Sequence, residues 1–209
     1  PGTAAPVILN FMDVVGSKTG KLFPTGNPMD RIGGIDVTCI DVAMPMVITR
    51  AESLGKTGYE SREELDADRD FFERLEAVRL EAGERMGFGD VTGKVLPKFA
   101  IIAAPRDGGS IASRYFVPTE THAAYAVTGS ICLGSCCVIP GTVADGLARV
   151  SNTPIETIEI EHPSGVIQTV LEVEQADGQF SLLKAGTLRT ARRLFAGEIY
   201  ASREKVLAG

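Results

Sequence analysis

Tryptophan is absent from this chain of 209 residues, aromatic residues make up only 6% of it, and histidine occurs twice. We therefore expect an aliphatic core. Cysteine is also scarce, and Cys39, Cys132, Cys136 and Cys137 form no CxxC spacing, which argues against a zinc site. We expect these thiols to be reduced and buried, in a cytoplasmic protein.

Positive charge is in short supply, with 21 Lys and Arg against 27 Asp and Glu and a net charge of −6. This balance argues against nucleic acid as a partner, but it leaves room for a local basic cluster that holds an anionic small molecule. The composition, 44% hydrophobic and 23% charged, is typical of a globular protein. One domain over residues 1–209 is the first expectation, two small domains are the alternative, and no membrane segment is expected.

The stretch Thr121–Thr142 contains no Asp, Glu, Lys or Arg. A helix that is apolar on all sides belongs inside a protein, and Pro140 is expected to end this one after about 18 residues, the lower limit for crossing a bilayer. Its many small residues favour close packing by surrounding backbone, so we predict a core helix wrapped by strands. Thr119 or Thr121 would cap it, His122 would lie in its first turn, and its start would bind an anion if it opens into a cleft.

Residues 61–86 predict an amphipathic helix, because apolar residues recur at helical spacing and Ser61 with Glu64 forms a capping box. A tight turn at residues 163–165 is expected to join two strands, and RTARRL (189–194) favours either strand or a short helix. The order of elements has no βαβ alternation and predicts an α+β fold. We expect strands at residues 6–15, 35–50 (one strand, or two broken by Pro45), 95–104, 111–117, 155–163, 165–174, 179–184, 187–195 and 198–201.

Few side chains are candidates for chemistry. Lys18 lies in GSKTG, where the lysine and the backbone N–H groups of a glycine-flanked turn could grip an anion, although the turn is too short for a P-loop and a solvated lysine is the alternative. His122 would donate to a carboxylate, act as acid or base, or be structural. We expect His162 to be exposed and the three helix cysteines to serve packing.

Three arginines, Arg189, Arg192 and Arg193, lie within five residues of an otherwise acidic chain. If this segment is a strand, at least one of them points inward, where a guanidinium needs a carboxylate partner. That partner is either a substrate or a buried Asp or Glu of the protein itself.

Several blocks are specific when they are taken in order: GSKTGKLFPTG, IDVAMPMV, LGKTGYE, MGFGD, LPKFAIIAAP, RYFVPTETHAAYAVTGSICL, IPGTV, HPSG and RTARRLFAGEIY. Together they resemble the methylaconitate isomerase family over nearly the whole chain, and within it they are most similar to the 4-oxalomesaconate tautomerases. The resemblance implies the diaminopimelate-epimerase-like fold, in which two halves each form a mostly antiparallel, barrel-like sheet around a central helix. The chain opens inside an apparent loop, PGTAAP, and is expected to be the second, C-terminal half.

The resemblance implies a cofactor-independent isomerase that moves a double bond or proton in a small tricarboxylate such as 4-oxalomesaconate, in the breakdown of aromatic compounds such as gallate. The family's catalytic lysine and cysteine lie in TSK-type and NCGN-type motifs of the first half, which this chain lacks, so we expect it to be inactive alone. The alternatives are a methylaconitate-type cis-trans isomerase and a non-catalytic truncated domain. The expected partners are the first half, a polycarboxylate and a possible second copy in a homodimer. By the resemblance, the substrate side is lined or supported by Ser17, Lys18, Thr19, His122, Ser164, Gly165 and Arg189, with His122 a weak catalytic candidate.

Overall fold

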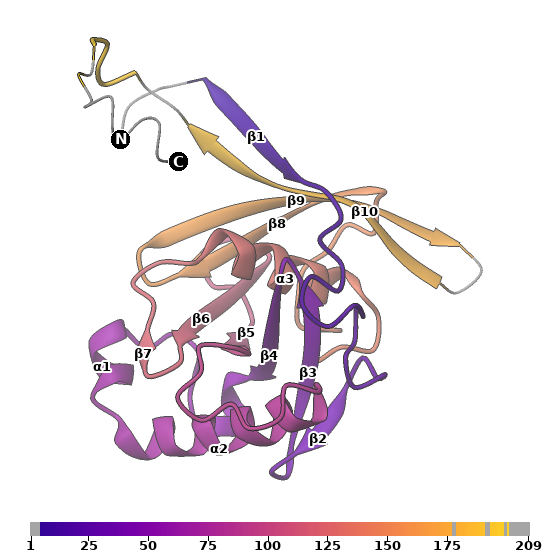
Figure 1. Cartoon of the computed structure of the whole chain (residues 1–209), viewed down its shortest axis with the longest axis vertical. Helices are drawn as coiled ribbons and strands as arrows, with labels where there is room; N and C mark the ends of the chain where they lie inside the picture. The colour runs from indigo at the N-terminus through magenta and orange to yellow at the C-terminus, as the bar shows by residue number, and fades with distance from the viewer. Residues whose placement is uncertain (1–4, 177–178, 191–192, 199, 201–209) are drawn as a thin grey trace.

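The computed structural model describes residues 5–176, 179–190, 193–198 and 200. One large, mostly antiparallel sheet dominates this part of the chain, accompanied by few helices (Figure 1). Among the described strands, the neighbours β4–β5 and β6–β8 run parallel and the other pairs run antiparallel. The strands follow one another across the sheet in the order β1 (Pro6–Phe11), β10 (Gln179–Thr190), β9 (Gly165–Ala176), β8 (Ile155–His162), β6 (Ile111–Val117), β5 (Lys98–Ala103), β4 (Met44–Arg50), β3 (Ile35–Val42) and β2 (Asp30–Ile32), with β7 (Glu120–Thr121) paired to β6.

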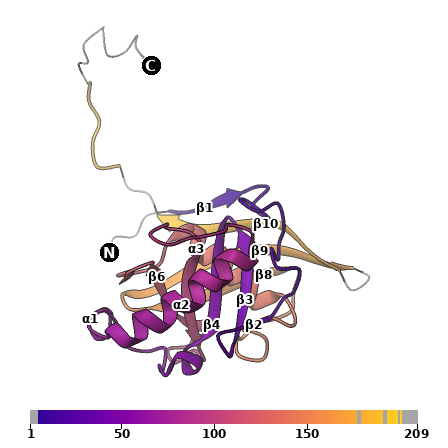
Figure 2. The same cartoon turned by 60° about the horizontal axis from the view of Figure 1, so that its bottom comes forward.

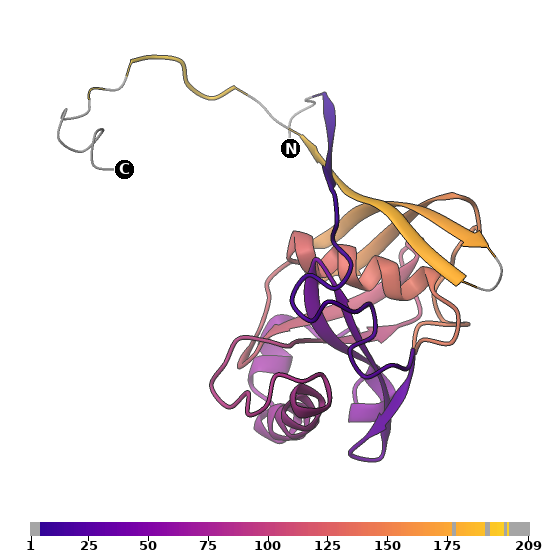
Figure 3. The same cartoon turned by 45° about the vertical axis from the view of Figure 1, so that its right-hand side comes forward.

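The sheet curves around helix α3 (Val127–Val138), which lies between β8–β10 on one side and β3–β4 on the other (Figure 3). Small residues allow this close approach: an added Cβ at Gly129 would lie 2.7 Å from the Tyr115 ring, and Ser130 accepts a 3.0 Å hydrogen bond from Thr169. The predicted core helix wrapped by strands is therefore present. Within the described ranges, no helix is both long and apolar enough to cross a membrane.

Helix α3 begins later than the sequence predicted. Thr121 pairs with Phe116 in the β6–β7 hairpin, and the backbone N–H of His122 continues this pairing by donating to the Tyr115 carbonyl at 2.8 Å. Ala126 precedes the helix and offers no side-chain cap. The expectation of a threonine cap with His122 in the first turn was thus wrong, because strand pairing holds these residues extended.

The predicted helix over 61–86 is instead two helices, α1 (Arg62–Asp66) and α2 (Arg69–Arg85). The capping box is confirmed: Ser61 accepts from the Glu64 N–H at 3.2 Å, and the Glu64 carboxylate accepts from the Ser61 N–H at 2.7 Å. The break arises because Asp68 starts a second cap, accepting from the Phe71 N–H at 2.9 Å. Helix α2 packs over β2–β5 on the sheet face away from α3, across a second apolar core (Figure 2).

Two other strand predictions change in detail. Residues 35–50 form two strands, but the break lies at Ala43, whose φ is +59°, and not at Pro45, which pairs with Asp41 inside β4. The two strands expected at 179–184 and 187–195 are one strand, β10, with an irregularity near Leu182 and an end at Thr190. Arg192 lies outside the described residues, and residues 198 and 200 are not in a strand.

Candidate functional site

One edge of the sheet gathers most of the predicted site residues. Strands β3 and β6 end at this edge and β4 and β5 begin there, as the pairs Val42–Met44 and Phe99–Phe116 require. Helix α3 begins at the same edge, where the hydroxyl of Thr128 lies 3.9 Å from the Met44 sulfur. The positive end of the helix dipole therefore lies beside the strand ends.

Residues 16–20 form a tight loop at this edge, tied to β3 by the bridge Val15–Val42. The fully buried carboxylate of Asp41 accepts from Ser17 Oγ at 2.8 Å, from the Lys18 N–H at 2.8 Å, and from the N–H and Oγ1 of Thr19 at 2.7 and 2.9 Å. The Lys18 side chain is exposed. In this geometry the backbone N–H groups point at Asp41, and the ammonium of Lys18 is the loop's free cationic group.

The two histidines come close to each other beside the β8–β9 turn. His122 Nδ1 accepts from the Ala124 N–H at 3.1 Å, and His162 Nδ1 accepts from the Ser164 N–H at 3.2 Å. The Ser164 hydroxyl donates to the Ala123 carbonyl and fastens the turn to the segment that carries His122. With both Nδ1 atoms accepting, a neutral ring carries its proton on Nε2, which is the nitrogen available to a ligand.

His162 was expected to be exposed, and it is half-buried instead. Burial, reinforced by the positive charges of Arg114 and His122, lowers the pKa of His162 below its usual value of 6.5. A signal for this position existed in the sequence, because Ile158, Ile160 and His162 alternate on one face of a strand. Gly165 completes the adjoining turn with φ at +132°, which a residue with a side chain rarely adopts.

Arg114 is 8% exposed and lines a hollow of about 460 Å³ together with Ser164. Its guanidinium donates to the Glu60 carbonyl at 2.7 Å and to the Ser113 carbonyl at 3.0 Å, and burial lowers its pKa. No described carboxylate pairs with it within 4 Å. The hollow is nevertheless net acidic, because three glutamates and two arginines line it. The hydrogen bond from Arg114 to Glu60 holds the loop before α1 against the sheet. The charged lining consists of Glu60, Arg62, Glu63, Glu64 and Arg114.

Arg189 lies apart from this cluster. It is exposed near the end of β10, opposite Val7, and lines a hollow of about 340 Å³ with Asp107 and Gln168. None of the residues that line this hollow also lines the hollow at Ser164. Arg193 is also exposed, so neither described arginine of RTARRL points into the core. Lys18 thus lies beside the end of β3, His122 and Ser164 lie together beside β6 and the β8–β9 turn, and Arg189 lies apart from both.

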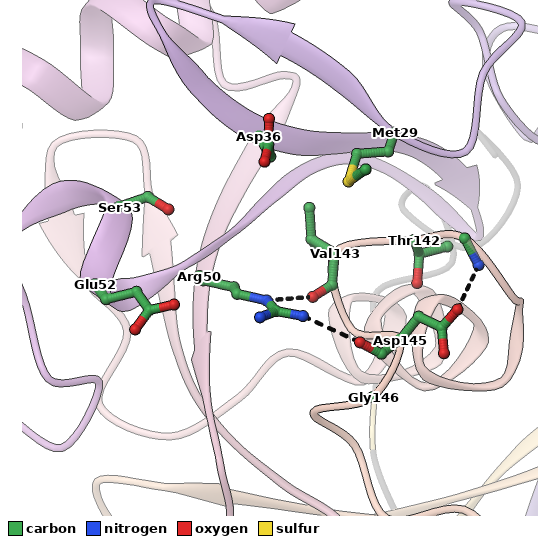
Figure 4. A pocket seen from close by; sticks show the side chains of 10 residues that line it. Met29, Asp36, Arg50, Glu52, Ser53, Thr142, Val143, Asp145 and Gly146 are labelled. Carbon is green, nitrogen blue, oxygen red and sulfur yellow. Dashed lines mark hydrogen bonds between the residues drawn. The ribbon is translucent and has the colours of Figure 1, made fainter.

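A further hollow, of about 480 Å³, lies at the opposite edge, where α3 ends (Figure 4). Arg50 donates to the carbonyls of Val143 and Asp145 at 3.0 Å each, and the Asp145 carboxylate accepts from the Gly141 N–H at 2.9 Å. Arg50, the one arginine that lines the hollow, is therefore bound to the protein backbone, and these bonds hold the turn after α3 in place. The carboxylates of Asp36 and Glu52 also line it, so it does not suit an anionic ligand.

The cysteines are unsuited to proton transfer. All four are buried, and burial raises the pKa of Cys39 to about 12, of Cys136 to about 11, and that of Cys132 and Cys137 well above its usual value. A thiol with such a pKa is protonated at neutral pH and is a poor base or nucleophile. Among the residues that the structure describes, no group of three His, Cys, Asp or Glu could hold a metal ion.

Comparison with known proteins identifies the family to which this chain belongs. The family model described as PrpF protein matches residues 1–202, and the chain belongs to the PrpF family. The resemblance noted in the sequence blocks is thereby confirmed.

The individual relatives include named isomerases. Protein YbhH of Escherichia coli (strain K12) is 48% identical over 200 residues, covering 96% of this chain and 56% of that protein. The (4E)-oxalomesaconate Delta-isomerase of Novosphingobium sp. (strain KA1) is 43% identical (96% and 55%), and the 4-oxalomesaconate tautomerase of Pseudomonas putida is 42% identical (98% and 55%). A crystal structure of methylitaconate-delta-isomerase superposes with a TM-score of 0.84 at 29% identity, over 99% of this chain and 58% of that one. The chain thus spans little more than half the length of the relatives that it matches.

Proposed function

We propose that this chain forms the second half of a two-half isomerase that acts on a small unsaturated polycarboxylate such as 4-oxalomesaconate. A proton leaves the carbon next to the double bond and another is returned at the far end, so that the double bond moves. No cofactor is required, because a neighbouring carboxylate or keto group makes the proton acidic. The active site lies in a cleft shared with the first half.

The grouping of polar residues at the start of α3 carries this proposal. The exposed ammonium of Lys18 offers a salt bridge to a substrate carboxylate, and His122 and Ser164 add polar groups at the same edge of the sheet. The positive end of the α3 dipole favours the negative charge that develops on an enolate. The raised pKa values of the buried thiols support a proton-transfer group that comes from the first half.

An ultraviolet assay of double-bond migration tests this function. The natural full-length polypeptide that contains this chain is expected to convert 4-oxalomesaconate, and the 209-residue chain by itself is expected to be inactive. Turnover by the chain alone would overturn the half-enzyme proposal and direct attention to Lys18 and His122 as catalytic groups. Methylitaconate and methylaconitate belong in the same assay, since a relative of known structure is named for the former.

Arg189 provides a second test of the substrate side. If it pairs with a substrate carboxylate in the complete enzyme, Arg189→Ala raises KM by a factor that corresponds to roughly 1.5–3 kcal/mol and leaves kcat nearly unchanged. Arg193→Ala is the matched control, because Arg193 is exposed in the same segment. An unchanged KM in Arg189→Ala removes this arginine from the site.

A non-catalytic domain with only weak carboxylate binding is the competing hypothesis. It predicts that the full-length polypeptide retains tricarboxylate binding but shows no turnover of any of the three acids. Isothermal titration with each acid, run beside the ultraviolet assay, separates the two hypotheses.

A further inference from the structure

The buried carboxylate of Asp41 is the feature that the proposed reaction does not yet use. Asp41 is fully buried, and no described ion pair includes it. Removing a carboxylate from water is costly unless hydrogen bonds replace its hydration. Here the four donors from Ser17, Lys18 and Thr19, at 2.7–2.9 Å, supply that replacement.

The hydrogen bonds around the Asp41 side chain suit a group that accepts. Oδ2 accepts from both backbone N–H groups and from the Thr19 hydroxyl, and Oδ1 accepts from the Ser17 hydroxyl. An asparagine of the same shape would turn an NH₂ group towards at least one of those donors. The backbone of Asp41 holds the same segment, because its carbonyl accepts from the Gly16 N–H at 2.8 Å and its N–H donates to the Leu22 carbonyl at 2.9 Å.

The loop closed in this way is compact. The Gly20 N–H donates to the Gly16 carbonyl at 2.8 Å, and Gly16 has φ at +66°. An added Cβ at Gly16 would lie 2.5 Å from the backbone of Gly20 and of Lys21, so only glycine fits. Lys18 therefore extends from a fixed backbone, whereas an unconstrained lysine would lose more conformational freedom on binding a ligand.

We propose that Asp41 is a positioning residue that directs Lys18 towards a substrate carboxylate, and that Ser17 and Thr19 hold Asp41 and do not contact the substrate. This inference rests on the proposed function, in which Lys18 binds the polycarboxylate. It gives Ser17 and Thr19 a supporting role. The Ser17 hydroxyl and the N–H groups of Lys18 and Thr19 donate to Asp41, and the Thr19 hydroxyl lies 2.9 Å from Asp41 and 3.2 Å from the Lys21 carbonyl. Lys18 itself forms no ion pair within the described chain, so its charge is free for a ligand.

A double-mutant cycle in the full-length polypeptide tests the proposal, with steady-state kinetics on 4-oxalomesaconate. Lys18→Met is expected to raise KM about tenfold or more, as the loss of a charged contact implies, with kcat changed less than KM. Asp41→Asn is expected to raise KM in the same way, and to add nothing once Lys18 is methionine. Lys21→Met is the matched control and is expected to leave KM within about twofold, since Lys21 is an exposed lysine directly after the loop.

Ser17→Ala and Thr19→Val give a second cycle, because each removes one hydroxyl bond to Asp41 and keeps the buried charge. If circular dichroism shows that Asp41→Asn does not fold, these two variants test the positioning role of Asp41 in its place. Each is expected to raise KM less than Lys18→Met does, and the effect is expected to vanish in the Lys18→Met background. Hydrogen exchange at the amides of Lys18 and Thr19 is expected to accelerate in Asp41→Asn.

The outcomes distinguish the positioning role of Asp41 from the proposed isomerase function. An active wild type in which the losses of Asp41→Asn and Lys18→Met add would overturn the positioning role and leave the isomerase function intact. A Ser17→Ala effect that persists in the Lys18→Met background would assign Ser17 to direct substrate contact and overturn its supporting role. A wild type without turnover of any unsaturated polycarboxylate would refute the proposed function and the substrate role of Lys18 with it.

Discussion

Glu161 anchors the loop between β5 and β6, and its replacement by glutamine gives a prediction whose size follows from the structure. The carboxylate is 6% exposed and accepts from the backbone N–H groups of Arg106, Asp107 and Gly109, each at 2.8 Å. Hydrogen bonds to a charged group contribute about 1.5–3 kcal/mol each, and a buried donor left without a partner costs about 1–3 kcal/mol.

In Glu161→Gln the amide oxygen keeps two acceptor sites for Asp107 and Gly109, now with neutral strength, while the NH₂ group faces the N–H of Arg106. The weakening of two bonds and the loss of the third amount to about 4 kcal/mol, and the lower cost of burying a neutral amide offsets part of this. We expect the free energy of unfolding to fall by roughly 2–3 kcal/mol at pH 7. Urea unfolding followed by far-ultraviolet circular dichroism measures it.

The pH dependence sharpens the test. Burial alone would raise the pKa of Glu161, but the three backbone N–H groups bring it below its usual value of 4.5. The stabilisation is therefore complete above about pH 4.5 and is lost as the pH falls through the folded-state pKa. Wild type and variant should converge in acid. Glu159→Gln is the control, since Glu159 is half-buried and accepts one 2.6 Å bond from Gln168. Equal losses in both variants, or a difference that persists in acid, would refute the reasoning.

Three further predictions follow from single contacts. Arg79 is 1% exposed, pairs with the partly exposed Glu76 through two bonds of 2.6 and 2.7 Å and donates to the Val91 carbonyl at 3.1 Å, so Arg79→Met should lower the free energy of unfolding by about 1–3 kcal/mol. Gly129→Ala should cost roughly 1–3 kcal/mol in the same assay, because its methyl group would lie 2.7 Å from the Tyr115 ring. The lowered pKa of His162 means that stability should decline as the pH falls below about 6.5, and His162→Gln should remove that component of the pH–stability profile.

Local chemistry explains which parts of this fold the sequence could predict. The capping box joins Ser61 to Glu64, and the turn at residues 163–165 joins adjacent strands, so both patterns are complete within a few residues. Asp41, in contrast, meets the loop at Ser17 across 24 residues of chain. From the sequence alone, Asp41 looks like any other polar residue in a strand. Its partners are known only once the pairing of β3 is known. The sequence therefore did not point to Asp41, whereas its glycine-flanked turn made Lys18 a candidate for anion binding.

The late start of α3 changes how the site is built. Had the helix begun at Thr121, His122 would lie in its first turn and its side chain would follow the helix surface. Strand pairing instead carries the chain in extended form past Tyr115, which places His122 5.8 Å from that ring, centre to centre, and beside the β8–β9 turn. The helix end supplies a background of positive potential, while the groups that could touch a ligand lie on segments fixed by the strand ends. Substitutions in the strands that hold these segments, above all at Asp41, should therefore change substrate binding more than substitutions within α3, whose residues mainly fill the core.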